Sequence, residues 1–288
     1  MAATAPLRVS LVQMSPNADL AHNLATAAAL ARRVIDYDGP DLLSFPEMWS
    51  CLGGDRAAKL AAAEPLPERG TDAGAGPCYQ FLQSLARTTG TTIHGGSIGE
   101  RAGDRLYNTT LLFDREGVEI ARYRKIHLFD VTTPDGAGYR ESALFGAGDQ
   151  IVTARVGDLT VGLAICYDLR FPELFAALRA QGADLIMLPA AFTLATGKDH
   201  WETLLRARAI ETQCWIAASA CWGKHQDASG ETRQTYGHSL IADPWGTVTA
   251  RASDGEGTIT GVIDPAMIAR IRADMPVFSH HRLVSRPA

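Results

Sequence analysis

An apolar run that stops abruptly at a cysteine constrains the fold of this chain more than any other feature. Residues 160–165 (TVGLAI) predict a buried strand, and Pro172 marks the start of a helix, because proline suits the first helical turn. Cys166 lies in the turn between them, at the mouth of a sheet, where the helix N-terminus favours a thiolate or an oxyanion. Free cysteine is also a common core residue, so Cys166 alone leaves a nucleophile and a core side chain equally open.

Two other strand-like runs also end at residues with useful chemistry. Residues 41–47 (DLLSFPE) predict a short apolar strand that Pro46 terminates and Glu47 follows. Residues 118–125 alternate apolar and polar side chains and end at Lys125. Ligands of α/β sheets bind beyond the carboxyl ends of the strands, so a carboxylate, an ammonium and a thiol are predicted to converge on one site.

Predicted strands and helices alternate along the chain. The strands are expected near residues 7–13, 41–47, 91–97, 106–113, 118–125, 150–156, 159–165, 184–188, 214–220, 235–242, 247–250 and 258–262. The helices are expected at residues 19–36, at 77–89, from the capping-box pattern Asp199-x-x-Glu202 to about Glu211, and after Pro265. Residues 129–148 lack periodicity and predict a long loop, of the kind that forms a wall or lid of a site. Periodicity alone leaves a three-layer α/β fold open.

Composition narrows the class of protein. A chain of 288 residues without a low-complexity linker is expected to form one large domain. A net charge of −5 gives no reason to expect nucleic acid or a membrane surface as a partner. Five cysteines without a C-x-x-C pair argue against a disulfide framework or a zinc ribbon. The first residues contain neither a basic region nor a long apolar run, so we expect a cytoplasmic protein without a signal peptide.

Three segments in this order resemble a known family. FPE at 45–47, YRKIHL at 123–128 and ICYDLRFPEL at 165–174 are similar to the Glu–Lys–Cys signature of the nitrilase superfamily of carbon–nitrogen hydrolases. The resemblance extends from Leu7 to about Leu283 and implies a four-layer α-β-β-α sandwich, with residues 1–288 as a single domain. Residues 191–244 further resemble the Nit branch, which contains deaminated-glutathione amidases and ω-amidases.

The resemblance assigns a role to each candidate residue. Cys166 is expected to attack an amide carbonyl and form a thioester, which divides a difficult hydrolysis into two easier steps. Glu47 is expected to act as general base. Lys125 and the backbone N–H of Tyr167 are expected to stabilise the oxyanion. Glu141 matches the family's second glutamate and is expected to be an accessory residue that orients the lysine.

The expected substrate is a small carboxamide, most closely deaminated glutathione or a related α-keto acid amide. An ω-amidase acting on α-ketoglutaramate is the first alternative, and a non-catalytic nitrilase-like binding protein is the second. Arg170 is a candidate for binding the substrate carboxylate, although pairing with Asp168 or Glu173 to hold the turn is favoured slightly. His127 is interpreted as a structural hydrogen-bonding residue. No cofactor or metal is implied, and the resemblance leads us to expect a homodimer or a higher homo-oligomer.

Overall fold

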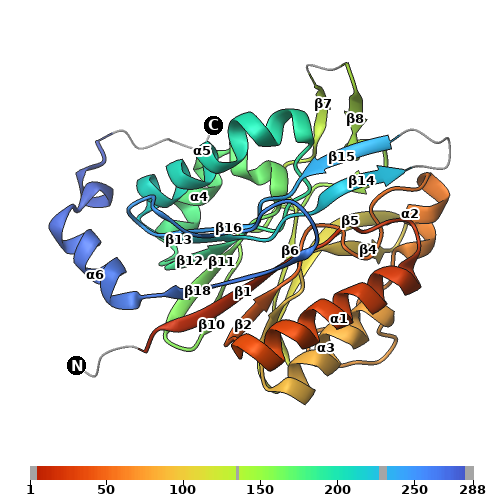
Figure 1. Ribbon diagram of the computed structural model, residues 1–288, viewed down its shortest axis with the longest axis horizontal. Helices are drawn as coiled ribbons and strands as arrows, with labels where there is room; N and C mark the ends of the chain where they lie inside the picture. Colours follow the sequence, from red (N-terminus) through yellow and green to blue (C-terminus); the bar gives the residue numbers. More distant parts are fainter. Residues whose placement is uncertain (1–4, 134–135, 227–231, 283–288) are drawn as a thin grey trace.

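Two β-sheets with helices on their outer faces form the molecule (Figure 1). The computed structural model describes residues 5–133, 136–226 and 232–282. The first sheet has the order β18 (Gly257–Ile263), β1 (Leu7–Gln13), β2 (Leu42–Ser44), β3 (Thr92–His94), β5 (Arg105–Phe113) and β4 (Ile98–Ala102), and β6 (Glu119–Arg124) and β9 (Phe145–Gly146) also pair with β5. The second has the order β10 (Thr153–Val156), β11 (Leu159–Leu163), β12 (Leu185–Met187), β13 (Trp215–Ala218), β16 (Leu240–Ala242) and β17 (Val248–Arg251).

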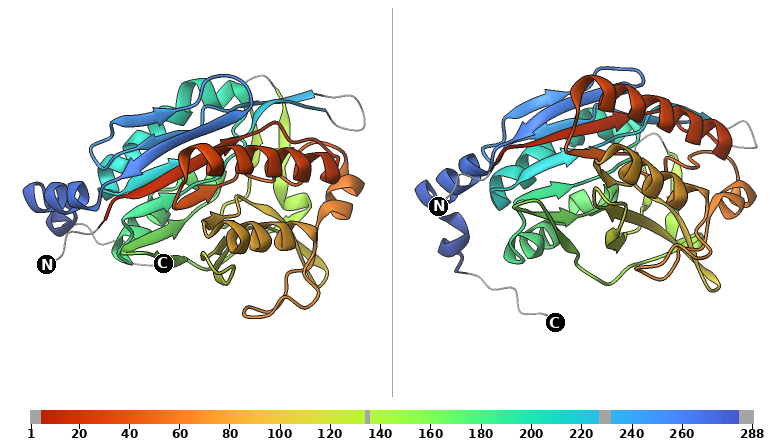
Figure 2. Two further views of the ribbon diagram at one scale, coloured as in Figure 1. Left: turned by 60° about the horizontal axis from the view of Figure 1, so that its bottom comes forward. Right: turned by 90° about the horizontal axis from the view of Figure 1, so that it is seen from below.

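Helices cover the outer face of each sheet. The first sheet carries α1 (Leu20–Asp38) and α3 (Pro77–Thr89), and the second carries α4 (Pro172–Ala180) and α5 (Leu194–Thr212). Figures 1 and 2 show the two helix pairs on opposite sides of the molecule. The shorter helices are α2 (Arg56–Ala62), α6 (Pro265–Asp274), η1 (Glu141–Ala143), η2 (Cys166–Arg170) and η3 (Val277–His280). This is the four-layer sandwich that the resemblance implied, and it replaces the three-layer alternative.

The alternation of side chains along the strands produces the layers. In β1, Val9 and Leu11 point into the core shared with the second sheet, whereas Val12 packs against α1 and α3. Neighbouring Leu42 and Leu43 divide between the two cores in the same way. Strands that are buried on both faces read as apolar runs, which is why periodicity did not separate three layers from four.

Local capping residues set the limits of α1. The Asp19 side chain accepts hydrogen bonds from the N–H groups of Ala21 and His22 and so begins the helix. Gly39 ends it in the left-handed region at φ 54°, which glycine adopts without a Cβ clash. The helix therefore confirms the prediction for residues 19–36 and is slightly longer.

Several local predictions were wrong. Helix α5 begins at Leu194, capped by the Thr193 side chain, so Asp199 lies inside the helix rather than at its start. The expected strand 235–242 is interrupted at residues 237–239, and β15 (Thr232–Tyr236) forms a hairpin with β14 (Trp222–Gln226). The expected loop 129–148 contains a second hairpin, β7 (Asp130–Thr132) and β8 (Gly138–Arg140), followed by η1 and β9. Short strands lacking an apolar face give no periodic signal.

Candidate active site

A strained turn presents the cysteine. Strand β11 ends at Leu163, the backbone is still extended at Ile165, and Cys166 then adopts φ 47°, a left-handed conformation that is unusual for a residue other than glycine. Its backbone N–H donates to the carbonyl of Pro189 at 2.9 Å. Helix α4 follows, with Pro172 in its first turn. The predicted order of strand, sharp turn and helix is therefore confirmed.

The carboxylate of Asp168 holds this turn in place. It accepts hydrogen bonds from the N–H of Ile165 at 2.8 Å, from the hydroxyl of Tyr123 at 2.7 Å and from the N–H of His127 at 3.0 Å. The Nδ1 atom of His127 lies 2.7 Å from the same carboxylate, and the imidazole stacks on Phe171 with ring centroids 3.7 Å apart. His127 is thus hydrogen-bonded to the residue that holds the turn, which agrees with the structural role that the sequence analysis assigned to it.

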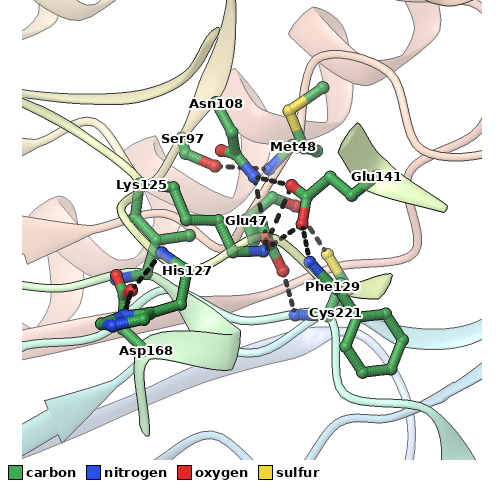
Figure 3. Close-up of polar contacts among 12 residues, drawn as sticks. Glu47, Met48, Ser97, Asn108, Lys125, His127, Phe129, Glu141, Asp168 and Cys221 are labelled. Atoms are coloured by element: carbon green, nitrogen blue, oxygen red, sulfur yellow. Dashed lines mark hydrogen bonds and ion pairs between the residues drawn. The ribbon is translucent and has the colours of Figure 1, made fainter. Parts of the chain in front are cut away.

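Three charged side chains from separate segments meet at one point (Figure 3). Cys166 lines the same cavity as these residues. Lys125, which follows β6, donates from Nζ to Glu47 Oε1 at 2.9 Å and to Glu141 Oε2 at 2.9 Å. Glu47 follows β2, and Glu141 is the first residue of η1. Only 2% of the Lys125 side chain is exposed. Burial lowers the pKa of Lys125, but the two carboxylates more than offset this and raise it well above its ordinary value, so the lysine is an ammonium.

Each carboxylate also accepts a backbone N–H. Glu47 Oε2 accepts from Ala191 at 2.8 Å, and Glu141 Oε2 accepts from Phe129 at 2.7 Å. Ala191 belongs to the segment that follows β12, so Glu47 of the first sheet is held by a group from the second sheet. The position of the carboxylate therefore depends on the packing of the two sheets.

The surroundings of Cys166 favour its neutral thiol form. Burial and the negative charge of Glu47 raise the pKa of the Cys166 thiol well above its ordinary value, and the positive charge of Lys125 offsets this only in part. The thiol therefore needs a neighbouring base to take its proton before or during attack, and Glu47 is the residue expected to act as that base. Glu47 lines the same cavity as this thiol and its charge acts on it.

A cavity of about 240 Å³ opens above these residues. Its apolar wall includes Phe129, Tyr167 and Phe192. The cationic residues of its lining, beyond Lys125, are Lys59, Arg140, Arg170 and Arg233. Glu47 and Glu141 are the acidic residues of the lining, and both already bind Lys125. A pocket with this balance of charge suits an anionic ligand.

Arg170 contributes to the cavity wall. Its guanidinium lies 5.3 Å from the centre of the Phe192 ring and 3.4 Å from Nδ1 of His200. No ion pair joins it to Asp168 or Glu173 among the residues that the structure describes. The structural pairing that the sequence slightly favoured is therefore not formed, and the arginine is placed where a ligand could reach it.

Sequence reasoning missed two parts of the site. Asn108, in β5, donates to both carboxylates, and only its strand-disfavoured residue type within an apolar run marks it in the sequence. The hairpin β14–β15 contributes His225, Gln234 and Thr235 to the lining, whereas the sequence had suggested its Trp222, which is not among the lining residues. Within the described residues, His, Cys, Asp and Glu side chains form no group of three arranged to hold a metal ion. Across the same ranges, no helix combines the length and apolar character needed to span a membrane.

Comparison with known proteins agrees with this geometry. Residues 8–273 match the model of the carbon-nitrogen hydrolase family. A deaminated glutathione amidase from Synechocystis sp. is 39% identical over 285 residues, which cover 97% of this chain and 99% of the relative. A human protein of the same name is 38% identical over 282 residues, or 95% of this chain and 82% of that protein.

Solved structures show the same architecture. Nit3 from Saccharomyces cerevisiae, a member of branch 10 of the nitrilase superfamily, has a TM-score of 0.82 at 28% identity and covers 96% of both chains. The C. elegans NitFhit protein has a TM-score of 0.86 at 34% identity. That match covers 97% of this chain and 66% of the NitFhit chain, so this protein corresponds to part of NitFhit.

Proposed function

This chain belongs to the carbon–nitrogen hydrolase family of the nitrilase superfamily, and we propose that it hydrolyses a small α-keto acid amide through a thioester on Cys166. It is a hydrolase of carbon–nitrogen bonds other than peptide bonds. The observation that carries the mechanism is the buried ammonium of Lys125, held between Glu47 and Glu141 beside the thiol.

Acylation begins with a proton transfer. Glu47 takes the proton of the Cys166 thiol while the sulfur attacks the amide carbonyl carbon, so a neutral thiol need not ionise beforehand. The carbonyl oxygen becomes an oxyanion, which Lys125 and the backbone N–H of Tyr167 stabilise. Tyr167 is the second residue of η2, where N–H groups lack an acceptor within the helix. The C–N bond then breaks, Glu47 returns its proton to the leaving amine, and a thioester remains.

Deacylation repeats this sequence with water as the nucleophile and the thiol as the leaving group. Glu47 takes a proton from water as the water attacks the thioester, and the same cation and N–H group stabilise the second oxyanion. The C–S bond breaks, the thiolate regains a proton from Glu47, and the product leaves as a carboxylic acid. Glu141 keeps Lys125 charged and oriented through both steps, since it binds the ammonium with both carboxylate oxygens.

The charge of the cavity supports an anionic amide as substrate. Arg140, Arg170 and Arg233 line the cavity, and a guanidinium can bind a carboxylate with two parallel hydrogen bonds. The two curated relatives described above are named deaminated glutathione amidases, which favours deaminated glutathione among α-keto acid amides. An ω-amidase acting on α-ketoglutaramate is the second candidate, because the same carboxylate site would serve it.

We expect a cytoplasmic homo-oligomer. Ile210 of α5 and Trp245 are 51% and 57% exposed, and apolar side chains of this size on one helix-bearing face suit contact with a second copy. All five cysteines are buried and free, which suits a reducing compartment. Light scattering coupled to size exclusion measures the oligomer, and a monomeric mass would contradict it.

A substrate screen tests the function. Release of amine and acid is measured with deaminated glutathione, α-ketoglutaramate, glutamine, N-carbamoyl amino acids and aliphatic nitriles. We expect the α-keto acid amides to be the best substrates and Cys166→Ala to be inactive. Iodoacetamide should add one mass increment that Cys166→Ala lacks, which separates an intact site from a binding protein. Steady-state turnover by Cys166→Ala would refute the thioester.

A further inference from the structure

A single amide group bridges the two carboxylates of the site. The Nδ2 atom of Asn108 donates to Glu47 Oε1 at 2.9 Å and to Glu141 Oε1 at 3.1 Å. Lys125 Nζ donates to the same two oxygens at 2.9 Å and 3.2 Å (Figure 3). The ammonium and the amide therefore bridge the same two carboxylate oxygens through four hydrogen bonds. Both hydrogens of the amide group are used in this way.

The neighbours determine the orientation of this amide. Ionised carboxylates only accept hydrogen bonds, so the NH₂ end of Asn108 must face Glu47 and Glu141. The Oδ1 atom is then buried and has no hydrogen-bond partner within the described part of the chain. An unpaired buried carbonyl destabilises a fold. Asn108 is 1% exposed, so this unpaired oxygen is not compensated by water. We take this to indicate that the two hydrogen bonds donated to Glu47 and Glu141 outweigh the cost of the unpaired oxygen.

The bridge also decides which oxygen of Glu47 can act on the thiol. Oε1 accepts from both Lys125 and Asn108, whereas Oε2 accepts from the N–H of Ala191. Oε2 is therefore the oxygen with a lone pair left for Cys166. We infer that Asn108 is a positioning residue of the hydrolase, which orients Glu47 toward the thiol and holds Glu47 and Glu141 side by side as carboxylates. This inference rests on the proposed function.

The charged groups that face Asn108 are few. Glu47, Lys125 and Glu141 contact it or share its partners, and Cys166 lies beyond Glu47. The ion pair of Glu100 and Arg124 bonds the side chain of Thr109, which points to the opposite face of β5. A charge placed at position 108 therefore acts on the catalytic cluster directly.

Asn108→Asp tests the bridge through its pH profile. The aspartate has nearly the same shape but donates only when protonated, and an ionised aspartate adds a third negative charge. We expect its activity relative to the unmodified protein to be at least about tenfold higher near pH 5.5 than near pH 8. Asn23→Asp is the matched control, because Asn23 is also buried but donates from Nδ2 to the backbone carbonyls of Asn17 and Ser50 and not to the catalytic carboxylates. Its relative activity should be the same at both pH values.

Two further measurements keep the inference separable from the function. Alkylation of Cys166 by iodoacetamide near pH 8 should be about tenfold slower in Asn108→Asp, because added negative charge raises the pKa of the thiol. This result would support the bridge even if no amide in the screen were cleaved, an outcome that overturns only the proposed function. Asn108→Leu should lose about 100-fold in kcat with KM within about threefold. The inference is overturned if the unmodified protein is active and Asn108→Asp has the same pH profile. It is also overturned if Asn108→Leu changes KM alone.

Discussion

Replacing Lys125 by methionine should destabilise the protein in a way that depends on pH. The substitution keeps the length of the side chain and removes the ammonium that Glu47 and Glu141 both contact at 2.9 Å. In the variant, the only side chain that still donates a hydrogen bond to both carboxylates of the described cluster is Asn108. Removing one partner of a buried ion pair typically costs about 3–5 kcal/mol, because the remaining charge is left without compensation.

The expected change in melting temperature follows from this free energy. A loss of about 4 kcal/mol in a chain of this size lowers Tm by roughly 8–12 °C. The sign of the pH dependence is also fixed. Two close carboxylates in the variant raise the pKa of one above its value in the unfolded chain, so the folded state binds a proton more tightly. This proton stabilises the folded variant fully at pH values below the pKa that the carboxyl group has in the unfolded chain. The stabilisation is lost as the pH rises through the higher pKa of the folded state.

Thermal unfolding followed by circular dichroism measures both effects. The deficit of Lys125→Met should be full near pH 8 and smaller by about 1–2 kcal/mol near pH 5, where the pair binds a proton. Lys224→Met is the matched control, because Lys224 is exposed on β14 and should melt within about 2 °C of the parent. A variant at position 125 that melts like this control, or whose deficit does not shrink in acid, would refute the buried three-residue cluster.

Three further predictions concern activity. Glu47→Gln should abolish amide turnover yet speed alkylation of Cys166 near pH 7, because the charge of Glu47 helps raise the pKa of the thiol; slower alkylation would contradict this electrostatic argument. His127→Ala should lose less than about tenfold in kcat/KM, since the ring does not line the cavity, and a loss equal to that of Lys125→Met would reassign it. Arg170→Lys should raise KM at least about tenfold for an α-keto acid amide but not for a neutral amide, and equal effects on both would remove Arg170 from the substrate site.

The sequence predicted the parts of the site that lie at strand ends. Glu47 and Cys166 each follow an apolar run and Lys125 ends an alternating one, and both patterns are visible because strands must bury one or both faces. Their convergence followed from the rule that strand ends share one edge of a sheet. The four-layer arrangement needed the family resemblance, because apolar runs do not show which face each side chain takes. Val12 and Leu11 are equally apolar and pack into different cores.

Other parts of the site have no local signal. Asn108 acts through partners that are 61 and 33 residues away in the chain. The raised pKa of Cys166 comes from burial and from the charge of Glu47, and neither influence can be read from neighbouring residues. The surroundings of Arg170 also have no local signal in the sequence, because its expected partner Asp168 already binds Tyr123 and His127.

The site belongs to neither sheet alone. Glu47 and Lys125 follow strands of the first sheet, whereas Cys166 and Ala191 follow strands of the second. The hydrogen bond from Ala191 to Glu47 crosses between them at 2.8 Å. The distance from the base to the thiol is therefore set by how the two sheets pack, and the shared core fixes that packing. Substitutions in this core should impair turnover at positions that never touch the substrate, because a small displacement of one sheet separates proton donor and acceptor.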